Sequence, residues 1–312
     1  MENGISGSFS VKSGGCILSP ILFLMVIDWI QRNTTHDKMR GIQWTMFSHL
    51  EDLDFVDDLA EVSGNIIHLQ ENTDKLNSFA KQTGLNINAK KTKVMTINAP
   101  EPVTLNGEAL EEVEDFTYLG SIPSKDNGTG KDIKSRLSKT QIAFAQLQPI
   151  WKSNNYSLRT KLQLYNSNVK SVPLYGSECW RVVDSDMRRV EAFHNNCLRK
   201  INRIFWPNKI SNRDLHKKSK STSITTEIKQ RRMRWLGLVM RTPQGRIPKI
   251  TLHWTPSGKR KRGKPRTTWR RTRTSELEEM GYSWGQVQYV AKDRRWIQLV
   301  EALCPIGGKG DK

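Results

Sequence analysis

The stretch LEDLDFVDDLAEVS, residues 50–63, places two adjacent carboxylates between apolar residues. Asp57 and Asp58 follow Phe55 and Val56 directly. Because a charged pair seldom interrupts a buried strand, residues 41–63 are predicted to form two strands with a tight turn at Val56-Asp57-Asp58. Such a turn suits divalent-metal chemistry, since Mg²⁺ prefers carboxylate oxygens that stay open to water. An Asp-Asp pair is also common in surface turns as a solvated charge, so the motif alone leaves both interpretations open.

Charge is distributed unevenly along the 312 residues. Residues 1–150 hold 14 Lys/Arg and 19 Asp/Glu, a net charge of −5, whereas residues 151–312 hold 36 and 12, a net charge of +24. The second half also contains eight of the ten tryptophans. Interleaved cations and aromatic rings favour a nucleic-acid partner, because phosphates contact the cations and bases stack on the rings. A basic surface by itself also suits an anionic membrane or plain solubility.

Other classes of protein are disfavoured by the sequence. The longest apolar-rich stretch, residues 17–30, contains Asp28 and is too short to span a membrane. A signal peptide is not recognisable, so the sequence predicts an intracellular protein of the nucleus or cytoplasm, without a membrane partner. The four cysteines are scattered, which is typical of reduced thiols. Cys179, His194 and Cys197 come nearest to a zinc pattern, but a fourth ligand is not evident and ordinary packing is preferred.

The spacing of apolar residues predicts the elements. A helix should begin at Ser19-Pro20 and run to about residue 31, and a second should cover 66–82 and end at Gly84. Short strands are expected at 85–97, 103–105 and 113–119. After a turn-rich break at 123–130 the pattern becomes helical, with one later helix at 224–240. Residues 256–274, rich in Lys and Arg and lacking acids, are predicted to be extended and flexible before helical spacing returns at 276–303.

Three further blocks accompany the Asp-Asp stretch in a fixed order: SGGCILSPILF at 13–23, GLNINAKKTKVM at 84–95 and DFTYLGS at 115–121. Together they resemble the palm of a reverse transcriptase from a non-LTR retrotransposon, of the RTE-like endonuclease-reverse transcriptase type. SRLSKTQIAFAQLQPIW is similar to the start of the thumb in that family, and the resemblance continues through LYGSECW, FHNNCLRKI, RIFWPNKIS, RRMRWLGLVMR, GKRKRGKPRTTWRR and RRWIQLVEALCP.

The resemblance implies an α+β fold class in three regions. Residues 1–125 would form a partial palm, with a small antiparallel sheet and helices. Residues 126–205 would form a helical thumb-like region, and residues 206–312 a basic nucleic-acid-binding region with RNA and DNA as partners.

The resemblance also implies site residues. Asp57 and Asp58 match the aspartates that hold Mg²⁺ in the family. Gly15, Ser19 and Pro20 match the block that shapes the pocket for the incoming nucleotide and the template.

Further along the chain, Lys91 matches a lysine near the nucleotide phosphates, where it could protonate the leaving pyrophosphate; a solvated surface lysine is the alternative. Tyr118, Leu119 and Gly120 match a hairpin that supports the primer end, with strand packing as the alternative.

Cations and tryptophans of the last hundred residues are the expected nucleic-acid ligands: Arg231, Arg232, Arg234, Trp235, Lys259, Arg260, Lys261, Arg262, Arg266, Trp269, Arg270 and Arg271. The run Lys259–Arg262 also suits a nuclear import signal or a solvated loop.

Three departures from the family pattern weigh against activity. About three residues of the family block are missing around Gly14-Gly15, and Glu61 replaces an apolar residue. The polymerase palm needs a third carboxylate upstream, where Glu2 is the sole acid before Cys16. The sequence therefore predicts a fragment of an RNA-directed DNA polymerase, using two-metal nucleotidyl transfer in the parent family, with little Mg²⁺ affinity and no activity as an isolated chain. The alternative is a non-catalytic nucleic-acid-binding protein.

Overall fold

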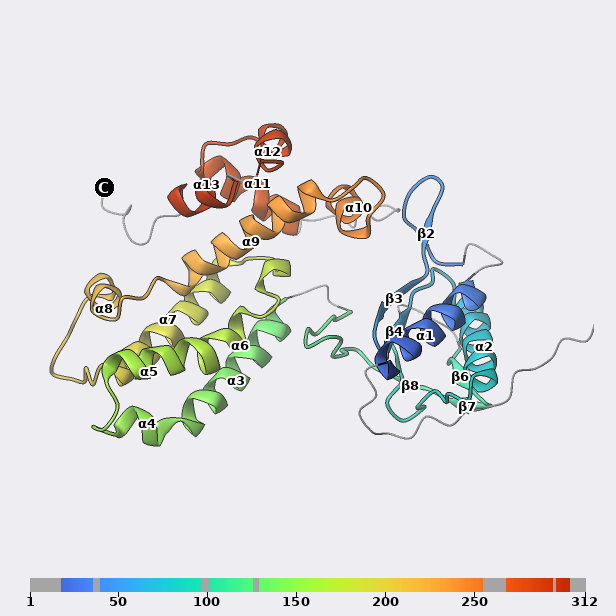
Figure 1. Cartoon of the computed structure of the whole chain (residues 1–312), viewed down its shortest axis with the longest axis horizontal. Coiled ribbons are helices and arrows are strands. Elements are labelled where there is room, and N and C mark those ends of the chain that lie inside the picture. Colours follow the sequence, from blue (N-terminus) through green and yellow to red (C-terminus); the bar gives the residue numbers. More distant parts are fainter. Residues whose placement is uncertain are drawn as a thin grey trace, which may run out of the picture. The chain divides into compact units, whose positions relative to one another are not determined.

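The computed structural model describes residues 18–35, 40–96, 101–125, 129–254, 268–293 and 296–303. The chain divides into two compact units, residues 1–119 and 120–312, which are coloured blue to green and green to red in Figure 1. The first unit combines helices with short strands and the second is helical. The fold class is therefore α+β, as the sequence predicted.

The first unit is built on two helices, α1 (Ser19–Thr35) and α2 (Ile66–Gln82), that lie side by side (Figure 1). Ile27 and Ile30 of α1 pack against Leu76 and Ala80 of α2. The bounds of α2 confirm the expected helix. Its first turn is capped by the Asn65 side chain, which accepts the backbone N–H of Ile67.

The other regular elements of the first unit are short strands. Three pairs are antiparallel: β1 (Ile42–Gln43) with β2 (His49–Leu50), β3 (Asp52–Phe55) with β4 (Asp58–Glu61), and β6 (Thr104–Leu105) with β7 (Glu108–Ala109). β5 (Lys93–Val94) and β8 (Glu111–Glu112) are parallel. Val94, Val103, Leu105 and Leu110 form a small core beneath them. The expected strands at 85–97 and 113–119 were wrong in extent, since among the described residues only 93–94 of the first range and none of the second lie in a strand.

The first half of the second unit is a helical bundle. Its elements are α3 (Gly130–Gln146), α4 (Gln148–Lys152), α5 (Leu158–Leu164), a π-helical turn (Tyr165–Lys170), α6 (Ser171–Leu174), α7 (Asp184–Ile201) and α8 (Asn212–Lys218). Phe144, Trp151, Tyr165 and Leu198 are at its centre. The Phe144 and Trp151 rings stack with centroids 5.3 Å apart.

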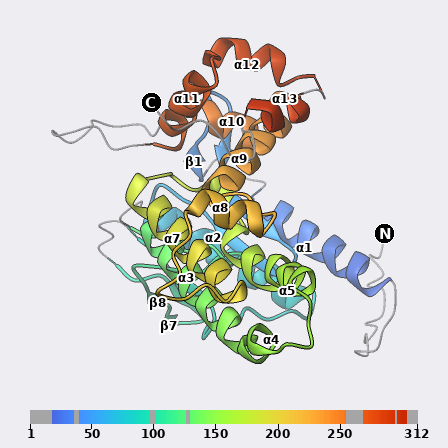
Figure 2. The same cartoon turned by 90° about the vertical axis from the view of Figure 1, so that its left-hand side faces the viewer.

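The second half of this unit surrounds the long helix α9 (Ile224–Arg241). Figure 2 shows α11, α12 and α13 grouped beside it. The elements are α10 (Ile247–His253), α11 (Trp269–Glu279), α12 (Trp284–Val290) and α13 (Trp296–Leu303). Residues 269–274 were expected to be extended, but they form the start of α11. The helix forms because Thr268 caps it and Leu277 is buried against α9.

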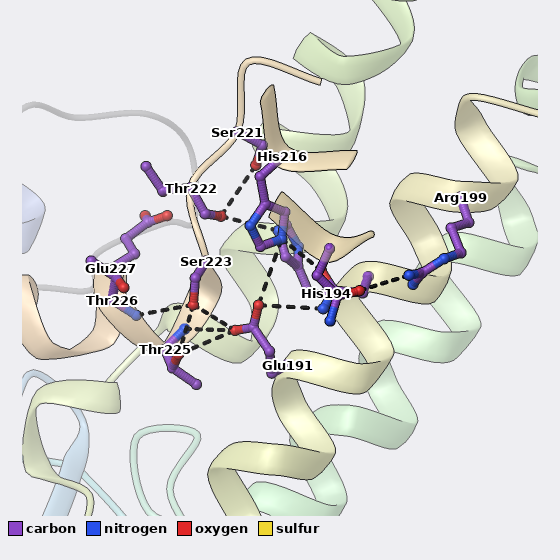
Figure 3. Close-up of polar contacts among 12 residues, drawn as sticks. Glu191, His194, Arg199, His216, Ser221, Thr222, Ser223, Thr225, Thr226 and Glu227 are labelled. Atoms are coloured by element: carbon purple, nitrogen blue, oxygen red, sulfur yellow. Dashed lines mark hydrogen bonds and ion pairs between the residues drawn. The ribbon is translucent and has the colours of Figure 1, made fainter. Parts of the chain in front are cut away.

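A polar cluster joins α7 to the beginning of α9 (Figure 3). The Glu191 carboxylate accepts hydrogen bonds from the Ser223 hydroxyl at 2.8 Å and from the Thr225 backbone N–H at 3.1 Å. Negative charge at a helix N-terminus is favourable, because the backbone N–H groups there lack intrahelical partners. Glu191 therefore fixes where α9 starts relative to α7.

Candidate metal hairpin and nucleic-acid interface

The β3–β4 hairpin presents the Asp-Asp pair at its tip. Phe55 pairs with Asp58 in the antiparallel register, which leaves Val56 and Asp57 as the two turn residues. Two-residue hairpin turns need a positive φ, which Gly and Asn adopt most easily. Val56 nevertheless has φ of 61°. A β-branched residue is rare there and costs energy, and residues held in such conformations cluster at functional sites.

Both aspartates of the tip are exposed to solvent. The pair offers oxygen ligands of the type that Mg²⁺ accepts when water and substrate phosphates complete its coordination shell. Within the described residues, no group of three or more His, Cys, Asp or Glu side chains is placed to hold a metal ion. The donor set therefore fits a cation that is shared with a nucleotide and does not fit a closed structural site.

A second acidic group lies behind the tip. The Gln31 Nε2 group donates to Asp54 at 3.2 Å and to Glu61 at 3.1 Å, and so joins α1 to both strands of the hairpin. Burial raises the pKa of Glu61 to about 7. Partial burial and the neighbouring Asp52 raise the pKa of Asp54 to about 7. From the sequence, Glu61 stood out only as an acid in place of an apolar residue, and Gln31 had no predicted role, because the two residues are 30 positions apart.

Tyr118 is anchored to the same hairpin. Its hydroxyl donates to the backbone carbonyl of Leu53 at 2.7 Å. Burial, followed by the charges of Asp54 and Asp58, raises the Tyr118 pKa. Leu119 and Gly120 follow with φ of 49° and 75° and so reverse the chain. Tyr118 is thus close enough to the aspartate tip to sense its charge.

The remaining first-unit residues are distributed more widely. Lys91 is exposed, and its backbone N–H donates to the Asn88 carbonyl at 3.0 Å. Ser19 and Pro20 open α1, as predicted, while Gly15 lies outside the described residues.

Three arginines of α9 take part in ion pairs within the second unit. Arg231 lies 3.8 Å from Glu178 and 3.5 Å from Glu227, and Arg234 lies 3.3 Å from Glu301. Arg232 has no exposed surface, and its guanidinium bonds Glu276 at 3.1 Å and Thr272 at 2.9 Å. The Arg232 side chain therefore joins α9 to α11 and is not accessible to a ligand.

The two tryptophans of the expected nucleic-acid set pack against each other. Trp235 and Trp269 meet edge to face with centroids 5.3 Å apart, and the Trp269 Nε1 group donates to the Glu178 carbonyl. Arg270 and Arg271 are exposed, and Arg270 lies 5.3 Å from the centroid of the Trp284 ring. Lys259, Arg260, Lys261, Arg262 and Arg266 lie outside the described residues.

Cys179, His194 and Cys197 do not form a group of metal ligands in the described part of the chain. His194 is fully buried, and both of its ring nitrogens are engaged. Nδ1 contacts the Tyr165 hydroxyl at 2.7 Å. Nε2 contacts the Thr222 carbonyl at 3.2 Å, and both His194 and Thr222 are labelled in Figure 3. Burial lowers the His194 pKa to about 3. Packing, the preferred interpretation of this pattern, agrees with these contacts.

Comparisons with known proteins bear on both units. Residues 3–122 match the family described as reverse transcriptase (RNA-dependent DNA polymerase), and residues 143–175 match a domain of unknown function, DUF6451. A transposon-derived protein of Caenorhabditis elegans is 24% identical over 269 residues, which cover 81% of this chain and 95% of that protein. None of the helices in the described part is long and apolar enough to cross a membrane. Residues 3–122 are thus a reverse transcriptase segment, and the chain is related to retrotransposon reverse transcriptases.

Proposed function

We propose that this chain is the palm and thumb part of an RNA-directed DNA polymerase from a non-LTR element of the RTE-like type. One observation carries the proposal: the hairpin presents Asp57 in a two-residue turn and Asp58 at the first position of β4, next to Val56 with its unfavourable φ of 61°. Its substrates are an RNA or DNA template with its primer and nucleoside triphosphates. Because such templates occur in the nucleus and the cytoplasm, the proposed location is one of these two compartments.

Each residue has a role in this proposal. Asp57 and Asp58 would hold Mg²⁺, which when bound neutralises charge on the nucleotide phosphates. Exposed Lys91 contacts those phosphates, and Tyr118 positions the primer end beside the tip. Ser19, Pro20 and Gly15 shape the nucleotide pocket, and Arg270 and Arg271 contact the nucleic-acid backbone, together with the cations at 259–262 and 266.

We propose further that the isolated chain binds its template without extending a primer. Support comes from the ligand count: two carboxylates at the tip, without a third grouped with them among the described residues. Loss of one member of a catalytic constellation commonly costs several orders of magnitude in rate.

Metal-directed cleavage tests the hairpin. Fe²⁺ can replace Mg²⁺ and, with ascorbate and peroxide, cuts the backbone beside its ligands. Cleavage within residues 50–62 is expected for the native chain and for Asp74→Asn, which alters an exposed acid on α2. Asp57→Asn and Asp58→Asn should each abolish it. Equal cleavage in all four proteins, or none in any, would remove the metal assignment.

Primer extension on an RNA template tests the proposal that the isolated chain does not extend a primer. No product above the background of the Asp57→Ala variant is expected from the purified chain. Extension that Asp57→Ala abolishes would refute the inactivity while supporting the polymerase assignment.

The binding-only alternative is favoured by the net charge of +24 on residues 151–312. It predicts unchanged template affinity in Asp57→Asn at any Mg²⁺ concentration. The polymerase proposal predicts that Mg²⁺ strengthens binding of the template–primer with nucleotide only when both aspartates are present.

A further inference from the structure

The helical bundle of the second unit contains a cavity of about 690 Å³ that has no role in the proposed polymerase site. Its walls come from α3, α4, α7 and the segment that follows α7. The volume is within the range of about 300–1,000 Å³ that is typical of pockets for small organic groups.

The walls of the cavity are aromatic. Phe144 and Trp151 form a stacked pair with an interplanar angle of 21°, and Phe193 and Phe205 complete the lining. Phe205 is 59% exposed, so its ring is open to a ligand. The next residue, Trp206, is 84% exposed. Two adjacent aromatic side chains, one of them in the wall of the cavity, are therefore open to water.

The rim of the cavity is cationic. Lys152, Lys200 and Arg203 line it, and no Asp or Glu is among the described residues that do so. The Lys200 ammonium lies 5.9 Å from the centroid of the Phe144 ring, directly over the aromatic wall. The Arg203 guanidinium donates to the Lys152 carbonyl, which holds these two residues together.

Aromatic walls combined with three lining cations favour a flat ring attached to an anion. We propose that this cavity receives an unpaired base of single-stranded RNA or DNA, which stacks on Phe205, while Lys152, Lys200 and Arg203 contact the adjacent phosphates. The inference deepens the proposed function, since it rests on a nucleic-acid substrate. The helical bundle would then bind bases, whereas cations elsewhere in the chain contact the nucleic-acid backbone.

The test compares two oligonucleotides of equal length and charge, one intact and one with abasic residues, by fluorescence anisotropy with the full chain. Stacking is worth about 5- to 100-fold in affinity per base, so the intact strand should bind at least about fivefold tighter. Phe205→Ala should remove this preference. Tyr289→Ala, at an aromatic side chain on α12 that is 78% exposed, should keep it.

Lys200→Gln supplies an independent check. It should weaken both strands equally and make the dependence of log affinity on log salt shallower by about one, because one phosphate contact is lost. Thermal melting of each variant shows whether it folds. Cross-linking of an oligonucleotide that carries 5-iodouracil should map to the cavity-lining residues between Phe193 and Phe205.

The outcomes separate this inference from the proposed function. Equal affinity for the two oligonucleotides, or a preference that survives Phe205→Ala, would overturn the base pocket, while binding of a template–primer duplex would still support the polymerase assignment. If neither single strand nor duplex binds, both proposals fail. Binding of an apolar peptide with no effect of oligonucleotides would reassign the cavity to a protein partner.

Discussion

Val56 shows how a single residue can expose a functional constraint. Its φ of 61° falls in the left-handed region, where a branched Cβ crowds the neighbouring carbonyl. The cost is of order 1–3 kcal/mol, and the sequence retains Val where Asn or Gly would relieve it. Strain of this kind favours a functional role for the tip over a purely structural one.

Substituting Val56 tests this view. Val56→Asn should raise the free energy of unfolding of the first unit by about 1 kcal/mol, because Asn adopts the left-handed conformation more easily. Ile67→Asn, at a side chain on α2 that is 63% exposed, is the matched control and should give no gain. Denaturant unfolding followed by circular dichroism measures both. A loss of stability in Val56→Asn would contradict the strain argument.

Glu61 makes the stability of the hairpin depend on pH. Its pKa is raised by burial from 4.5 to about 7 in the folded chain, so the folded state favours the protonated form. Deprotonation therefore destabilises the fold increasingly as pH rises from 4.5 to about 7, and the full penalty is present above that value.

Glu61→Gln should remove that penalty. The variant should be more stable than the native chain by about 1–3 kcal/mol at pH 8, and the difference should vanish near pH 4, where Glu61 is protonated in both states. Glu108→Gln, at an exposed position of β7, should show no such convergence. Thermal melts across this pH range provide the measurement, and a pH-independent difference would refute the assignment.

At the scale of elements, Gly237 determines how closely α9 and α13 approach. A Cβ atom at this position would lie 2.2 Å from the Trp296 ring, whose Nε1 group donates to the Met233 carbonyl at 2.8 Å. The contact places a fully buried tryptophan directly against the backbone of the long helix.

Gly237→Ala should therefore displace α13 and destabilise the second unit by about 2–4 kcal/mol, despite the better helix propensity of Ala. Gly285→Ala, on α12 with open space around it, should be neutral or stabilising by up to about 1 kcal/mol. Calorimetry of both variants distinguishes the effect of the Trp296 contact from the effect of helix propensity. Equal effects would show that Trp296 does not need the glycine.

Elements with local determinants could be predicted from the sequence. α2 has a cap, a helical apolar spacing and Gly84 with φ of 77° at its end, so its bounds follow from adjacent residues. The β3–β4 hairpin is equally local. Strands of two residues such as β5 and β8 form only because tertiary contacts bring positions 93 and 111 together, which the alternation of side chains cannot reveal.

The candidate site also contains residues that could be predicted from local sequence and residues that depend on tertiary contacts. The aspartate tip could be read from the motif and its neighbours, whereas the burial of Arg232 depends on Glu276, 44 residues away. Local sequence shows a charge but not its partner, so Arg232 was included among the expected nucleic-acid ligands although its side chain is buried. The aromatic cavity was missed because its walls come from three helices that are separate in sequence.

For the whole molecule, the charge of the second half predicts salt-dependent binding of nucleic acid. With four or more phosphates neutralised, log affinity for single strands should fall with log salt at a slope of about −3 or steeper. Arg271→Gln should make the slope shallower by about one, while Arg234→Gln should not, because Arg234 is paired with Glu301. A flat salt dependence would refute the nucleic-acid interface.

The β3–β4 hairpin finally implies an order of assembly. Residues 52–61 contain five carboxylates and no Lys or Arg, so the tip repels a phosphate backbone on its own. In the proposed function, counter-ions must therefore arrive first or together with the strand, and divalent cations do this at lower concentration than monovalent ones. The concentration of free divalent cation would then decide when a strand can settle at the tip, whatever the affinity of the basic half of the chain.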